Sequence, residues 1–102
     1  MAVKAIVKNS YEALIVFTPG LSEKDLVEAV QQIESAIKNN GGTISKVDEP
    51  IRKRFTHKIK NFKDGYYISM YFDSPPEVPN ILKRSLSISD NVLRYVLIRK
   101  EK

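Results

Sequence analysis

The 102-residue sequence predicts a single α+β domain, with a four-stranded antiparallel sheet and two helices on one face. Three observations support this class. Strand and helix patterns alternate in the order β-α-β-β-α-β along the chain. Hydrophobic residues make up 42% and charged residues 28%, which is ordinary for a folded globular domain. Two right-handed crossover units joined by a hairpin then give a split β-α-β, or ferredoxin-like, sandwich.

The first strand and first helix have clear sequence signals. Aromatic and β-branched residues predict a strand over Tyr11–Thr18, which ends at Pro19-Gly20. The hydroxyl of Ser22 can accept a bond from a first-turn amide, so this residue is expected to cap the helix. Apolar residues then recur at helical spacing as far as Ile37. Gly41-Gly42 ends the helix, because glycine tolerates the left-handed conformation of a C-cap.

The middle of the chain is expected to form the second and third strands. Thr43–Lys60 is long and extended, and Pro50 indicates that this strand is bent or lies at an edge, because proline cannot donate to a ladder. Asp64-Gly65 predicts the hairpin turn. The return strand is expected over Tyr66–Phe72.

The last third of the chain is expected to form the second helix and the fourth strand. The run Ser74-Pro75-Pro76-Glu77 is typical of a helix start, with Ser74 as the capping residue. The final strand is expected over Val92–Arg99. A single domain therefore spans residues 1–102, with residues 1–10 as an N-terminal extension and residues 100–102 as a charged tail.

The sheet face without helices is expected to carry an apolar patch. Successive strand residues point to opposite faces, so a core-facing set such as Ala13, Ile15 and Phe17 leaves the alternate residues outward. Patches of this kind mark partner sites. A strand facing the other way, or a tail covering the face, is the alternative. The predicted partner-binding residues are Leu14, Val16, Tyr67, Tyr71, Val96 and Ile98.

The second strand is the most basic part of a chain with 17 lysines and arginines against 12 acids, a net charge of +5. Its basic residues alternate mainly onto one side, and same-side positions about 6.6 Å apart approach the spacing of phosphates. An edge strand protected by charge against aggregation is the alternative. With one residue from the last strand, the predicted RNA-binding residues are Arg52, Lys53, Arg54, Lys58, Lys60 and Arg94.

The sequence offers no catalytic, metal or cofactor site. His57 is the single histidine and cysteine is absent, so no nucleophile–base couple or ligand cluster can be assigned. Neither a signal peptide nor an apolar run of about 18 residues is present, which indicates a cytoplasmic protein with no membrane partner. Two alternatives stay open: a ligand-sensing dimer that pairs through its sheet, and an acylphosphatase-type hydrolase. The loop Thr18–Ser22 lacks the arginine and asparagine that such a hydrolase needs.

Short motifs in a fixed order run through most of the chain. They comprise Tyr11-Glu12, Pro19 with Leu21, Lys53-Arg54, Gly65-Tyr66 and the run Asp90-Asn91-Val92-Leu93-Arg94. In their order and spacing the sequence resembles the bacterial ribosomal small-subunit protein six family, from about Tyr11 to Lys100. Two departures are Thr18, where the family has asparagine before the proline, and Phe55-Thr56-His57-Lys58-Ile59, where the family has Leu-Ala-Tyr-Pro-Ile.

The resemblance implies a structural, non-enzymatic role in the small ribosomal subunit. It implies binding to the central domain of 16S-type ribosomal RNA, in the platform, together with small-subunit protein eighteen. It also implies that the protein is a monomer when free and is located in the cytoplasmic ribosome.

Overall fold

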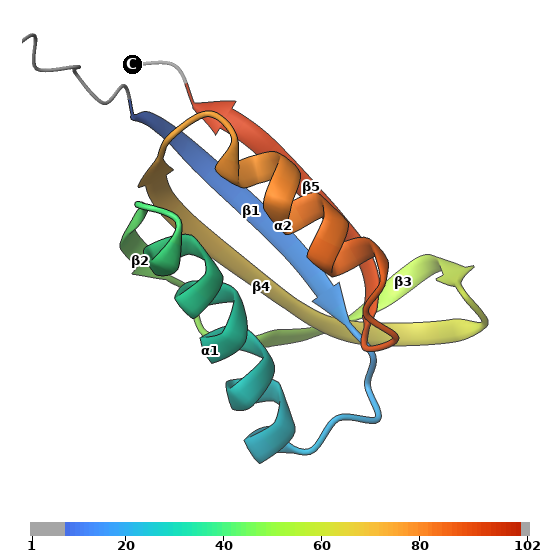
Figure 1. Cartoon of the computed structure of the whole chain (residues 1–102). Coiled ribbons are helices and arrows are strands. Elements are labelled where there is room, and N and C mark those ends of the chain that lie inside the picture. The colour runs from blue at the N-terminus through green and yellow to red at the C-terminus, as the bar shows by residue number, and fades with distance from the viewer. Residues whose placement is uncertain (1–7, 101–102) are drawn as a thin grey trace, which may run out of the picture.

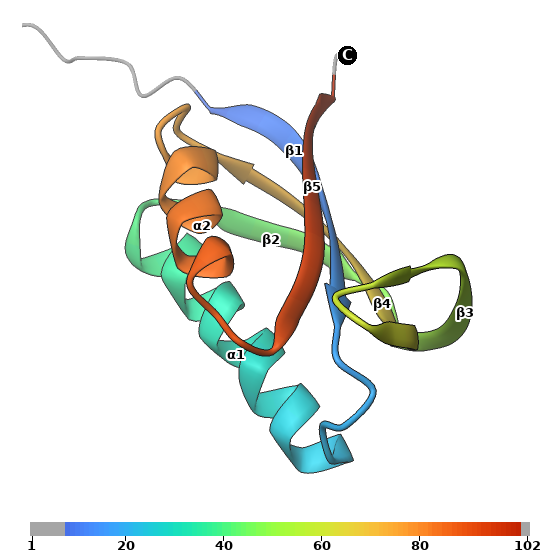
Figure 2. The same cartoon turned by 90° about the vertical axis from the view of Figure 1, so that its right-hand side faces the viewer.

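The computed structural model describes residues 8–100, which form one five-stranded antiparallel sheet and two helices. The elements are β1 (Asn9–Phe17), α1 (Glu23–Asn39), β2 (Thr43–Val47), β3 (Ile51–Ile59), β4 (Phe62–Ser74), α2 (Val78–Ser87) and β5 (Val92–Lys100) (Figure 1). The strand order is β2-β4-β1-β5, and β3 also pairs with β4. Both helices cover the same sheet face (Figure 2). The predicted ferredoxin-like class and the two central strands are confirmed.

The helix-side core follows the predicted facing of the strands. Ile15 and Phe17 of β1 are 0% and 1% exposed, and Ile68 and Phe72 of β4 are 1% exposed each. The helices cover them with a second apolar layer that includes Leu26, Ile37, Val78, Leu82 and Leu86. This period-two burial leaves the alternate residues of β1, β4 and β5 on the face without helices.

The first helix begins where predicted. The Ser22 hydroxyl accepts a bond from the Asp25 amide at 3.1 Å, which satisfies one of the free amides of the first turn. Gly41 follows the helix with a φ of +87°, in the left-handed region that glycine tolerates.

The predicted long second strand is wrong in one respect, because it is two strands separated at Pro50. The Asp48 amide donates to the Ser69 carbonyl at 2.9 Å, and β3 resumes pairing only at Ile51, opposite Tyr67. Proline has no amide to continue the ladder. The sheet therefore has five strands where four were expected.

The predicted hairpin turn at Asp64-Gly65 is also wrong. The chain turns at Lys60 and Asn61, whose φ values are +48° and +71°, and Ile59 pairs with Phe62 across a two-residue turn. Positive φ at both central positions is the geometry that matches the twist of a hairpin. Asp64 is instead a strand residue, paired with Arg54 in the β3–β4 ladder.

The cap and the chain ends also differ from expectation. Ser74 is the last residue of β4, fully buried and paired with Asn9, so it cannot cap α2. Glu77 occupies the cap position without a side-chain bond. The expected extension, residues 1–10, already enters β1 at Asn9, and residues 1–7 lie outside the described part of the chain. Of the expected tail, Lys100 ends β5 and residues 101–102 lie outside the described part.

Candidate protein and nucleic-acid interface

The open sheet face carries the predicted apolar residues side by side. In the ladder Leu14 of β1 lies between Ser69 of β4 and Val96 of β5, and Glu12 lies between Tyr71 and Ile98. Val96 and Ile98 are 38% and 47% exposed, which is high for aliphatic side chains in a sheet. Three adjacent strands therefore present a mainly apolar and aromatic surface, the open-face patch, formed by Leu14, Tyr67, Tyr71, Val96 and Ile98. Glu12 lies within this surface and forms an ion pair with Lys100 at 3.1 Å.

The hairpin formed by β3 and the first residues of β4 borders this patch at one end. Because Phe17, the last residue of β1, pairs with Tyr66, residues 62–65 project beyond β1. Figure 2 shows the hairpin turning away from the helices, toward the open side. At its tip Lys60 donates to the Val92 carbonyl of β5 at 3.4 Å. Since β1 lies between β4 and β5, the hairpin crosses the end of β1 to make this contact.

The hairpin covers part of the open face. A side-chain carbon placed on Gly65 would lie 2.9 Å from Cζ of Phe55 and 3.1 Å from Cγ1 of Val16, so the phenyl ring and the valine meet over this glycine. The same ring packs edge-on against Tyr67, with 6.0 Å between centroids. Val16 is only 3% exposed and Leu93 only 6%, although neither belongs to the helix-side core. Val16 therefore has the predicted facing, but it is buried beneath the hairpin.

Phe55 packs between the hairpin and β1, and no pattern in the sequence indicates this role. Phe55 stands out as an apolar residue in the basic strand. The residues that it meets, Gly65 and Val16, lie elsewhere in the chain, so local spacing does not identify them. The burial of Leu93 also depends on long-range pairing and was not predicted. The β1–β5 register shifts between Val16 and Phe17, which places Leu93 opposite no residue of β1.

The predicted RNA-binding residues do not form the expected single row. The β3–β4 register shifts after Arg54, and Lys60 lies in the turn. Arg52 is on the helix side, where its guanidinium pairs with Asp64 at 3.1 Å and lies 5.7 Å from the centre of the Tyr66 ring. The hydrogen bonds to Asp64 and the charge of this carboxylate raise the pKa of Arg52.

The other predicted cations are distributed around the hairpin. Lys53 is on the open side, with its ammonium 5.6 Å from the centre of the Tyr67 ring. Arg94 is exposed and pairs with Val16 in the ladder, so it borders the same end of the open-face patch. Arg54 and Lys58 are exposed and form no ion pair with another residue of 8–100. Lys53 and Arg94 therefore border the patch, whereas Arg54, paired with Asp64 in the ladder, lies on the same side of the hairpin as Arg52.

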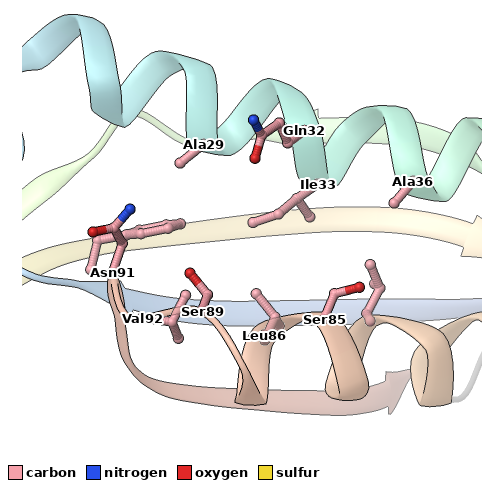
Figure 3. A pocket seen from close by; sticks show the side chains of 11 residues that line it. Ala29, Gln32, Ile33, Ala36, Ser85, Leu86, Ser89, Asn91 and Val92 are labelled. Atoms are coloured by element: carbon pink, nitrogen blue, oxygen red, sulfur yellow. The ribbon is translucent and has the colours of Figure 1, made fainter.

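A cavity of about 210 Å³ lies on the other side of the molecule, between α1 and α2. Figure 3 shows that its polar groups are the amides of Gln32 and Asn91 and the hydroxyls of Ser85 and Ser89. No acidic or basic side chain lines it, so it offers no group for proton transfer at neutral pH.

Among residues 8–100, no group of three or more histidines, cysteines, aspartates or glutamates could hold a metal ion. No helix in residues 8–100 has the length and apolar character needed to cross a membrane.

The fold and this face define a class: a ferredoxin-like binding domain with one face covered by helices and one face left for partners. The family model for ribosomal protein S6 matches residues 10–99. The chain therefore belongs to the ribosomal protein S6 family.

Individual relatives agree with this assignment. Small ribosomal subunit protein bS6 of Clostridium novyi is 32% identical over 94 residues, which cover 92% of this chain and 99% of that protein. The corresponding protein of Caldanaerobacter subterraneus is 35% identical over 93 residues, covering 91% and 98%. The crystal structure of 30S ribosomal protein S6 from Thermotoga maritima superimposes with a TM-score of 0.87 at 22% identity, covering 92% of this chain and 89% of that one.

Family membership confirms the resemblance predicted from the sequence. The protein is a structural, non-enzymatic component of the small ribosomal subunit, and its location is that of the family, the cytoplasmic ribosome. The acylphosphatase-type and ligand-sensing alternatives are set aside on this ground.

Proposed function

We propose that this protein binds 16S-type ribosomal RNA in the platform of the small subunit together with small-subunit protein eighteen. One observation carries the proposal: an uncovered apolar and aromatic sheet face continues directly into a hairpin rich in cations. The two surfaces differ in chemistry, since one suits a protein and the other suits phosphates. Their contact at Tyr67 and Lys53, 5.6 Å apart, supports simultaneous binding of both partners.

The RNA contacts are assigned mainly to cations that form no ion pair with another of the described residues, 8–100. Arg54, Lys58 and Arg94 are exposed, and Lys53 is held over the Tyr67 ring. Arg52 contributes less, because it must first give up its bonds to Asp64. Phosphate contacts of this kind position the protein on the RNA without reading its sequence.

The salt dependence of RNA binding tests this half of the proposal. Each neutralised phosphate releases counterions and adds about 0.7–0.9 to the slope of log affinity against log salt. The double variant Arg54→Ala/Lys58→Ala should lower the slope by about 1.5 in filter binding to a central-domain RNA fragment with protein eighteen present. The matched control Lys24→Ala/Lys38→Ala removes equal charge from α1 and should leave the slope unchanged. Equal slopes for both double variants would contradict the assignment.

The protein partner is assigned to the open-face patch. Tyr67 and Tyr71 supply the aromatic anchors, which is the residue type enriched at interface hot spots. Burial of Leu14, Val96 and Ile98 adds about 25 cal/mol per Å² of apolar surface before the cost of association is subtracted.

A matched pair of variants tests this second half. Val96 on the open face and Ile81 on α2 are each 38% exposed, so an aspartate at either site should be tolerated by the fold. Val96→Asp should abolish binding of protein eighteen in titration calorimetry, whereas Ile81→Asp should bind as the unaltered protein does. Light scattering of the free protein should give a monomer mass. Wild-type binding by Val96→Asp, or a dimer mass through the open face, would contradict the proposal.

A further inference from the structure

A second groove lies on the helix side, between α1 and the connection from β2 to β3. Two cavities of about 210 and 520 Å³ share Leu26 and Pro50 in their linings, so they lie next to each other. The apolar walls of the groove come from α1, β2 and β4, and the residues are Leu26, Val27, Val30, Val47 and Ile68. Val27 is 49% exposed, so an aliphatic side chain stands uncovered at the rim.

The rim of this groove is acidic although the chain as a whole is basic. Glu34 and Asp48 line the smaller cavity, and Glu23 and Glu49 line the larger one. No lysine or arginine lines either cavity. Lys46 pairs with Asp48 at 3.2 Å, while the three glutamates form no ion pair within residues 8–100. Four of the 12 acids of a chain with net charge +5 thus line these two neighbouring cavities.

We propose that this groove binds a lysine- and arginine-rich peptide segment of another protein, with one or two aliphatic side chains among its cations. The aliphatic side chains enter between Val27 and Pro50, where apolar surface is exposed. The cations pair with Glu23 and Glu49 on opposite sides of the groove. A nucleic-acid strand does not suit this surface, because its phosphates would be repelled by the carboxylates. The groove opens on the helix side of the sheet and meets the open face at the connection from β2 to β3, where Asp48, Glu49 and Pro50 also line a hollow beside Leu14, Lys53 and Tyr67.

The proposal is tested with a defined peptide and the full-length, isotope-labelled protein in NMR titration. The probe is Lys-Lys-Leu-Arg-Val-Lys-Arg, and its control, Lys-Lys-Ser-Arg-Ser-Lys-Arg, has the same charge without aliphatic side chains. We expect amide shifts confined to residues 23–34 of α1, residues 47–51 and residues 66–68 of β4. We expect the serine peptide to bind at least about fivefold more weakly, since exposed ion pairs alone contribute little.

Variants of the protein distinguish peptide binding through an apolar anchor from binding by charge attraction alone. Val27→Asp adds a negative charge but removes the aliphatic rim, so it should weaken binding about fivefold, whereas charge attraction alone would strengthen it. Glu23→Lys/Glu49→Lys should weaken binding roughly tenfold. The control Glu28→Lys/Asp90→Lys changes the charge equally at exposed sites that line neither cavity, and should stay within about twofold.

Several outcomes would overturn the proposal. They are peptide-induced shifts elsewhere on the molecule, equal affinity for the two peptides, or unchanged or tighter binding by Val27→Asp. Concentration-dependent self-association through the groove would assign it to a second copy of this chain instead. Urea denaturation of each variant verifies that the altered proteins remain folded.

Discussion

Gly65 determines how closely the β3–β4 hairpin can lie against the end of β1, and Gly65→Ala should therefore loosen the hairpin. A side-chain carbon at this position would lie 2.7 Å from the Phe17 carbonyl oxygen, 2.9 Å from Cζ of Phe55 and 3.1 Å from Cγ1 of Val16. The phenyl ring can rotate away, but the carbonyl belongs to the paired backbone of β1. Relief of the clash therefore requires a shift between β1 and β4 at the base of the hairpin.

The size of the effect follows from two opposing contributions. Forcing an extra carbon into a packed site costs about 1–3 kcal/mol. Replacing glycine by alanine returns about 0.4–1 kcal/mol, because the unfolded chain loses conformational freedom. The free energy of unfolding should thus fall by about 1–2 kcal/mol, which corresponds to a melting temperature lower by about 5–15 °C in a domain of this size.

Urea denaturation followed by circular dichroism measures the difference. Gly20→Ala is the matched control, because a side-chain carbon there meets nothing within 4 Å, and it should raise stability by about 0.4–1 kcal/mol. In a Phe55→Ala background the cost of Gly65→Ala should persist if the carbonyl of Phe17 causes it. Stabilisation by Gly65→Ala equal to that by Gly20→Ala would refute the close approach of hairpin and sheet.

Three further predictions concern charge, burial and capping. Asp64→Asn releases Arg52 from its ion pair and should steepen the salt dependence of RNA binding by up to about 0.7 in filter-binding assays; an unchanged slope would show that Arg52 does not reach RNA. Val16→Asp places an unpaired carboxylate at a site 3% exposed and should cost more than about 3 kcal/mol in urea denaturation, whereas Val96→Asp at 38% exposure should cost less than about 1 kcal/mol. Ser22→Ala removes the bond to the first-turn amide and should cost about 1 kcal/mol in thermal unfolding, and Ser22→Asp should recover most of it.

The parts of the fold that depend on local patterns could be predicted from the sequence. Period-two alternation determined which residues of β1 and β4 face the helices, and Ser22 marked the start of α1. Each of these signals depends on a few neighbouring residues, so contacts with distant parts of the chain do not alter the local structure that it predicts.

The parts that failed depend on competition between local signals and long-range pairing. Asp64-Gly65 has the stronger turn composition, but β4 pairs with β1 as far as Tyr66 and continues outward through both residues to pair with β3. The turn is thereby displaced to Lys60-Asn61, where asparagine tolerates positive φ. Ser74 failed as a cap for the same reason, because its pairing with Asn9 extends β4 by two residues.

The candidate site shows how tertiary structure changes the meaning of residues whose type and facing were predicted correctly. The composition of the basic strand suggests that Arg52 and Lys60 are available to phosphates. In the structure, Arg52 pairs with Asp64, and Lys60 donates to the Val92 carbonyl and so holds the hairpin against β5. Counting apolar residues treats Val16 as available to a partner, yet the hairpin buries it. The corrections for Lys60 and Val16 have the same cause, the return of the hairpin across the end of β1, whereas the ion pair of Arg52 forms within the hairpin itself. The hairpin thus uses part of the predicted site to place Lys53 beside the open-face patch.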